Sequence, residues 1–222
     1  DPSYADALGN AAKAARALAE RSGVPLTDAD REGVRLYREA IAADSPDDTY
    51  MFLAPAGHAL DIARFKLASL LRKRGALEEA VGLLKAVLAH DAIPSKCPQK
   101  IYFPRHSALI LLAEMMVTGE TPGLPTEALA LLEESVLPIK RHSLDGHREY
   151  VLCLTHKALS AVHAQGPQGE HALQAFHHAS QAMEFGHAES VQELAICYAE
   201  GFGTVVSLHH ACTLFLMGCK LN

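Results

Sequence analysis

The stretch His187–Cys219 reads HAESVQELAICYAEGFGTVVSLHHACTLFLMGC, and its pattern decides the fold expected for the chain. Apolar residues recur at helical spacing on both sides of Gly201-Phe202-Gly203. Glycine readily adopts the left-handed conformation that ends many helices, so the pattern predicts two helices joined by a tight turn. Each helix has an apolar face and must bury it against a neighbour.

Several residues in this stretch are spaced as in a Sel1-like repeat, which is a close relative of the tetratricopeptide repeat. Both repeats are helix–turn–helix units that stack on one another. The resemblance therefore implies that this stretch is one such unit. The residues at the matching positions are Leu194, Ala195, Tyr198, Gly201, Phe202, Gly203 and Ala211.

A second, clearer tetratricopeptide-like unit lies at 58–94. Ala68 and Ala80 are small at the expected crossing of its two helices, and Gly75 permits the turn between them. The other residues at the family's spacing are Leu67, Leu71 and Leu84, with Pro94 beyond the end. The pattern of Leu194, Ala195, Tyr198 and Gly201 also recurs at Leu112, Ala113, Met116 and Gly119.

The whole chain is expected to be all-α, as a right-handed α-solenoid of about five stacked antiparallel helix pairs. No pair can bury its apolar face alone, so the pairs are expected to form a single helical-repeat domain over 1–222. Their predicted limits are 1–46 and 58–94 (tetratricopeptide-like), 105–140 (Sel1-like or tetratricopeptide-like), 145–186 (degenerate) and 187–222 (Sel1-like).

The composition favours closely packed helices. Apolar residues make up 49% of the 222 residues, aromatic residues only 6%, and there is no Trp. Alanine lets helices approach one another and leucine fills the contact between them. No stretch shows the alternating pattern of a half-buried strand.

The charge of the chain argues against nucleic-acid binding. The formal net charge is −6, whereas proteins that bind phosphate backbones usually carry a basic surface. The longest apolar stretch, Ala108–Val117, contains Glu114 and is too short for a membrane span. Residue 1 is Asp rather than Met, so a targeting segment can be missing from this sequence.

The cysteines indicate an intracellular protein, cytoplasmic or organellar. Five cysteines at irregular spacing do not resemble a disulfide framework, and we expect mostly buried, reduced thiols. One alternative stays open, a disulfide between Cys197 and Cys212 that joins the last two helices.

The resemblance implies that a partner peptide binds the concave surface lined by the first helix of each pair. The positions carried over are Ile62, Phe65, Ser69 and Arg72 in the clearest unit, and Glu189, Gln192 and Ile196 in the last. Chaperone-binding relatives use Lys and Asn where this chain has Phe65 and Ser69, so a Glu-Glu-Val-Asp tail is not the expected ligand. Alternatively, Phe65 belongs to the core.

The predicted loop 91–104 is a second candidate for partner binding. It joins two aromatic residues to flanking cations, a combination enriched at binding hot spots. The alternative is that Tyr102 and Phe103 pack beneath the solenoid and hold the loop in place. The candidate residues are Lys100, Tyr102, Phe103 and Arg105.

No catalytic, cofactor or metal motif is found. The sequence lacks a Walker-type phosphate loop, a dinucleotide-binding glycine motif and a Gly-x-Ser-x-Gly nucleophile motif. The 13 histidines include His171 and His178, seven residues apart, and the adjacent His209 and His210, but none has zinc-site spacing. The six histidines between 171 and 222 predict pH sensitivity below about 6.5.

These observations favour a non-catalytic scaffold, adaptor or assembly subunit that binds another protein through the solenoid groove and the loop 91–104. One alternative is a regulatory or substrate-recruiting domain of a larger enzyme, such as a kinase or ubiquitin ligase. A more remote one is a helical-repeat RNA binder. The last predicted helix, Leu208–Cys219, is strongly apolar for a terminal repeat and is therefore expected to dimerise or to be capped by another segment.

Overall fold

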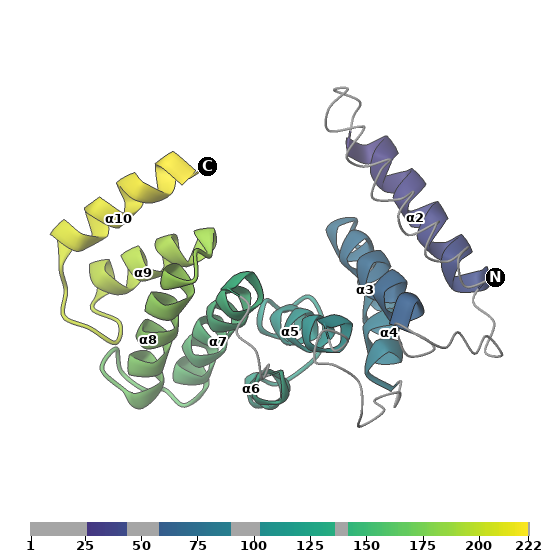
Figure 1. Cartoon of the computed structure of the whole chain (residues 1–222). Helices are drawn as coiled ribbons and strands as arrows, with labels where there is room; N and C mark the ends of the chain where they lie inside the picture. The colour runs from purple at the N-terminus through teal and green to yellow at the C-terminus, as the bar shows by residue number, and fades with distance from the viewer. Residues whose placement is uncertain (1–25, 44–57, 90–102, 136–141, 222) are drawn as a thin grey trace. The chain divides into compact units, whose positions relative to one another are not determined.

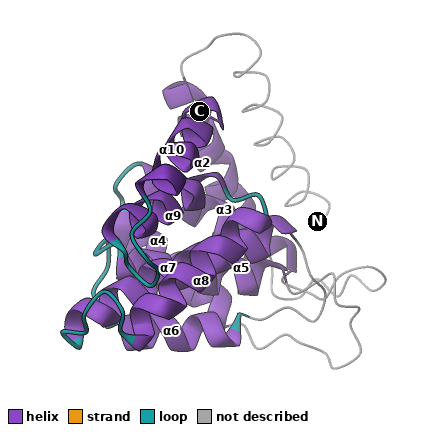
Figure 2. Cartoon of the chain, turned by 90° about the vertical axis from the view of Figure 1, so that its left-hand side faces the viewer, coloured by secondary structure: helices purple, strands orange, loops and turns teal. Residues whose placement is uncertain are grey.

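The computed structural model describes residues 26–43, 58–89, 103–135 and 142–221. All regular structure in these ranges is α-helical, in nine helices labelled α2 to α10 (Figures 1 and 2). The all-α prediction is confirmed for this part of the chain. None of these helices is both long and apolar enough to cross a bilayer. The expected first helix of the 1–46 pair lies outside the described residues.

The chain divides into two compact units, residues 1–108 and 109–222, and the boundary falls within α5 (Phe103–Val117). In the first unit, α2 (Leu26–Ala43) packs on α3 (His58–Lys73), which packs on α4 (Leu77–Ala89). Helix α5 begins at Phe103, which was predicted to lie in the loop 91–104, two residues before the expected start at Arg105. Pro104, the last residue of that predicted segment, suits a first helical turn and lies in one. Proline fits there because a first-turn N–H has no intrahelical partner.

The α3–α4 pair is closed as its sequence predicts. Ala68 and Ala80 are fully buried, so nothing larger than a methyl group separates the helices at these points. Gly75 has φ 77°, and the backbone N–H of Ala76 donates to the Leu71 carbonyl oxygen at 3.0 Å. The left-handed glycine thus ends α3 and turns the chain into α4.

The second unit is a run of helices in which each packs on the next. Helix α6 (Pro125–Glu134) packs on α7 (His142–Val162), and α8 (Glu170–Glu184) packs on α7. Helix α9 (Ala188–Glu200) contacts α8, and α10 (Leu208–Leu221) contacts α9. Helices α9 and α10 are the two helices predicted on either side of residues 201–203.

A stripe of small residues on α8 holds the end of this unit together. Ala172, Ala175, Ala179 and Ala182 are all fully buried. Cys153 of α7 and Leu194 of α9 join two of these alanines in one core cluster, with Tyr198 packed against it. Alanine lets neighbouring helices approach closely while larger side chains fill the remaining space.

The turn between α9 and α10 is fixed against the start of α8. Gly203 has φ 69°, and a Cβ atom there would lie 2.1 Å from the Ala172 carbonyl oxygen. Its N–H donates to the Pro167 carbonyl oxygen at 2.7 Å, and the Gln168 amide donates to the carbonyl oxygens of Gly201 and Thr204, each at 2.7 Å. Only glycine fits at residue 203, and this contact sets where α10 begins.

Candidate functional site

Helix α10 exposes several large apolar side chains to solvent, together with His209, His210 and Thr213. From Leu208 to Cys219 its sequence contains no Asp, Glu, Lys or Arg. Ala211 is its buried contact with the rest of the unit. Leu208 and Leu216 are each 67% exposed, and Phe215 and Met217 are each 41% exposed. Exposed large apolar side chains gathered on one helix commonly mark a site of protein association.

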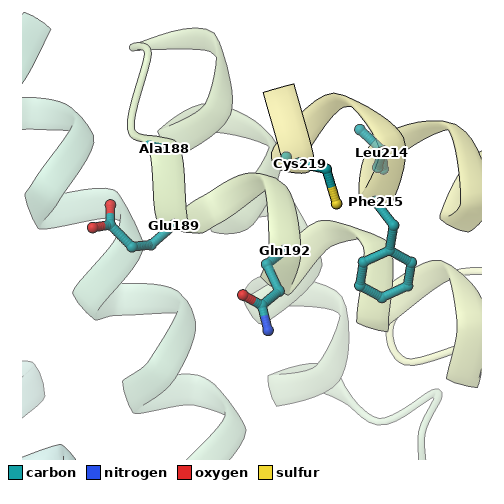
Figure 3. A pocket seen from close by; sticks show the side chains of 7 residues that line it. Ala188, Glu189, Gln192, Leu214, Phe215 and Cys219 are labelled. Atoms are coloured by element: carbon teal, nitrogen blue, oxygen red, sulfur yellow. The ribbon is translucent and has the colours of Figure 1, made fainter. Parts of the chain in front are cut away.

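A hollow of about 300 Å³ lies between α9 and α10, beside this surface. We call it the α9–α10 groove. One wall is polar and the other mostly apolar, and Figure 3 shows Glu189 and Phe215 at opposite edges. Gly218 keeps the floor open, since a Cβ there would meet only a Val191 methyl group, at 3.9 Å. The lining residues are Ala188, Glu189, Gln192, Leu214, Phe215, Gly218 and Cys219.

Most of the charged residues in the stretch of sequence that forms the groove are acidic. The sequence has no Lys or Arg between Lys157 and Lys220, but this stretch contains Glu170, Glu184, Glu189, Glu193 and Glu200. Lys157 is already engaged, because its Nζ lies 2.5 Å from the Glu193 carboxylate.

The Glu189 side chain lies exposed at the groove rim. Its carboxylate side chain is 69% exposed and lies 3.5 Å from His187 Nδ1. Burial lowers the pKa of His187, so this imidazole is neutral at pH 7 and does not compensate the charge. The rim therefore presents an exposed carboxylate group to a partner.

The two sets of predicted concave residues lie in different units. Ile62, Phe65, Ser69 and Arg72 share one face of α3 and are partly buried. Ser69 Oγ donates to the Phe65 carbonyl oxygen at 3.0 Å, and Lys66 Nζ lies 5.6 Å from the centre of the Phe65 ring. Partial burial fits both a binding face and a packing face, so the role of these residues stays a prediction. Glu189 and Gln192 line the α9–α10 groove in the second unit.

The loop candidates are described only in part. Lys100 and Tyr102 lie outside the described residues, and Phe103 is the first residue of α5. Arg105 donates from Nη1 to the Leu88 carbonyl oxygen at 2.6 Å. This bond ties the start of α5 to the end of α4, a structural role that the sequence did not suggest.

A histidine cluster joins α7 to α8. His156 is only 9% exposed, and its Nδ1 lies 3.1 Å from the Nδ1 of His171. The ring of His178 stacks on His156 with centroids 5.4 Å apart, and His163 stacks on His171 at the same separation. Burial, followed by the neighbouring His178 and His171, lowers the pKa of His156 to about 4. The sequence pointed to His171 and His178 but not to His156, their partner.

A buried polar chain continues from this cluster to α6. His178 Nδ1 lies 2.6 Å from Glu149, and a carboxylate only accepts, so Nδ1 is the donor. Arg148 pairs with Glu149 at 2.8 Å and donates to the Leu132 carbonyl oxygen at 3.1 Å. Within the described ranges, no three His, Cys, Asp or Glu residues are arranged to hold a metal ion. The geometry supports a structural contact that is sensitive to protonation.

The cysteines in the described residues are free thiols. Cys153 and Cys197 are buried, and Cys212 and Cys219 are exposed. Burial raises the pKa of Cys153 to about 12 and that of Cys197 to about 11, so neither is a thiolate at neutral pH. The alternative of a Cys197–Cys212 disulfide is not realised in this structure.

Comparison with known proteins gives no relative. No protein-family model, no curated protein and no solved structure matches this chain. The Sel1-like resemblance therefore stays an expectation based on the residues quoted above.

Proposed function

We propose that this chain is a non-catalytic helical-repeat module that binds another protein and acts as an adaptor, scaffold or assembly subunit. The proposal includes stacking of its helix pairs as a right-handed solenoid. One observation carries the functional part: the exposed apolar residues of α10 lie beside the hollow between α9 and α10. Fold alone does not fix function, so the argument rests on this surface.

The exposed residues are sufficient for specific binding. Burying a large apolar side chain contributes about 1.5–3 kcal/mol, and binding energy is usually concentrated in a few such residues. Leu208, Phe215, Leu216 and Met217 together can offset the entropic cost of association and leave useful affinity. In contrast, the acidic end of the chain does not favour the RNA-binding alternative.

The proposal is tested by quantitative affinity capture with three versions of the whole chain. The first is unchanged, the second carries Phe215→Ser and Leu216→Ser, and the third carries Leu173→Ser. Leu173 is a matched control because it is 50% exposed on α8 and does not line the groove. Circular dichroism must first show that all three are equally helical.

We expect a partner that is captured by the unchanged chain and by Leu173→Ser, and is lost from the double variant. Partners retained by the double variant would remove the α9–α10 groove from the proposal. If the unchanged chain captures no partner from an extract of the cells that naturally produce it, this result would argue against a binding module.

A further inference from the structure

We infer that the α9–α10 groove binds an amphipathic helix of a partner protein, and this inference rests on the proposed function. One face of that helix is apolar and the other is basic. The inference names the chemical class of the partner. It rests on two features of the second unit: the charge of the stretch around the groove and the different character of its two edges.

The charge of this part of the chain indicates a positively charged partner. The stretch from Ala158 to Cys219 contains five glutamates and no Lys or Arg. Glu193 is paired with the preceding Lys157, which leaves four glutamates against Lys220, the residue that follows the stretch. Such a field attracts cationic groups and repels nucleic acids, anionic membranes and acidic peptides. A partner with Lys or Arg residues is therefore steered toward this end of the chain.

The different chemistry of the two edges of the groove favours an amphipathic helix as the bound segment. At one edge Phe215 offers an aromatic surface 41% exposed, and at the other Glu189 offers its carboxylate (Figure 3). A helix is about 10 Å wide and presents different residues on its opposite sides. It can therefore place apolar residues on Phe215 and Leu216 while a cation reaches Glu189.

The size of the hollow fits this arrangement. A volume of about 300 Å³ is at the lower end of the range for ligand pockets, roughly 300–1,000 Å³. It accommodates side chains that anchor a helix lying on the surface, rather than a whole ligand. Helices that bind in grooves are usually held by a few such anchors at helical spacing.

A second copy of this chain is a poorer occupant. Its own α10 is apolar but has no Lys or Arg before Lys220, and the chain carries a formal net charge of −6. Pairing two copies through this face would bring two glutamate-rich ends together, and like charges oppose such association.

The test measures binding of a fluorescent peptide of about 18 residues, with Leu at helical spacing and Lys elsewhere, to the whole chain. The control peptides replace every Lys by Glu, or keep the composition in scrambled order. Anisotropy titrations are run at about 50 and about 300 mM salt. The chain is used unchanged and as the variants Phe215→Ser, Glu189→Gln and Glu133→Gln, the last removing an exposed glutamate of α6 that does not line the groove.

We expect the Leu/Lys peptide to bind at least about tenfold more tightly than either control peptide. Phe215→Ser should weaken binding roughly tenfold, since an aromatic anchor is lost. Glu189→Gln should weaken it about threefold at low salt and much less at high salt, whereas Glu133→Gln should have no effect.

Three results would overturn the inference, and they are distinguishable from failure of the proposed function. Equal affinity for the Leu/Lys and Leu/Glu peptides, both lost with Phe215→Ser, would reject the basic partner but retain a protein-binding groove. Self-association in sedimentation experiments that Phe215→Ser abolishes would assign the groove to a second copy. Failure of the folded chain to bind the Leu/Lys peptide would reject the class of partner, while the affinity capture above decides the function separately.

Discussion

Helices α4 and α10 are each the second helix of a pair, and each follows a left-handed glycine, yet their outer surfaces differ. The exposed face of α4 carries Glu78, Glu79 and Lys85, whereas that of α10 carries Leu208, Leu216 and Met217. The buried side of α4 is well packed, with Ala80, Leu84 and Val87 almost inaccessible. The two helix pairs are thus closed in a similar way, and their outer surfaces differ: that of α4 is charged, whereas that of α10 carries the apolar residues for which we propose a partner.

The largest expected effect is the loss of stability when a buried leucine of α4 is truncated, compared with an exposed leucine of α10. Leu84 is fully buried in α4, and Leu216 is 67% exposed on α10. Leu84→Ala should lower the free energy of unfolding of the first unit by about 3 kcal/mol, because it leaves a cavity. Leu216→Ala should change stability by no more than about 0.5 kcal/mol and act only on binding. Urea unfolding followed by circular dichroism measures both, and a large loss with Leu216→Ala would mean that α10 is not an outer face.

A smaller effect distinguishes the two glycine turns. At Gly75 a Cβ would meet no atom within 4 Å, so Gly75→Ala should cost only the left-handed backbone penalty, about 1 kcal/mol. At Gly203 a Cβ would collide with the Ala172 backbone, so Gly203→Ala should destabilise by about 2–3 kcal/mol. Hydrogen exchange resolved by mass spectrometry should show faster exchange of α10 amides in Gly203→Ala. Equal effects at the two positions would contradict the contact between this turn and α8.

The smallest of the three expected effects is the pH dependence of the stability of the second unit. The pKa of His156 is lowered to about 4 in the folded chain, from about 6.5 when exposed, so the unfolded chain binds more protons between these values. The contribution of this group is therefore complete above pH 6.5 and is lost as the pH falls toward 4. The full difference between these pKa values corresponds to about 3.4 kcal/mol, which solvent screening reduces to about 2 kcal/mol. The lowered pKa of His187 acts in the same direction.

The measurement is a series of urea unfolding curves between pH 7.5 and 4.5, with His156→Gln alongside. The variant removes the titrating group, so its stability should depend less steeply on pH whatever its absolute value. Identical slopes for the two proteins would show that the contact between α7 and α8 is not sensitive to protonation of His156.

Much of the helical pattern could be predicted from the sequence because it depends on local signals. Alternation of small and large apolar residues at helical spacing predicted α3, α4, α9 and α10, and Gly75 and Gly201 marked two helix ends. Pro104 suits a first helical turn and lies in the first turn of α5, but the helix begins at Phe103 rather than at Arg105, because an aromatic residue before a proline is compatible with a loop and with a helix start.

The candidate site was predicted less completely because it depends on how helices lie against one another. The repeat resemblance pointed to Glu189 and Gln192, which line the groove. The apolar run of the last helix predicted an interface or a capped face, but not that Leu214 and Phe215 line a hollow together with α9. The contact of His156 with His171 joins residues 15 positions apart across a turn. It requires a particular register of α7 against α8, and residue spacing within one helix carries no information about that register.

The stretch without lysine or arginine has a practical consequence for protein chemistry. Trypsin cleaves after these two residues, so it releases everything from Ala158 to Lys220 as one long fragment. Tryptic maps of cross-links, modifications or protection would therefore be nearly blind to helices α8, α9 and α10. A glutamate-specific protease can cut after Glu170, Glu184, Glu189, Glu193 and Glu200, and so divides the same region into readable pieces.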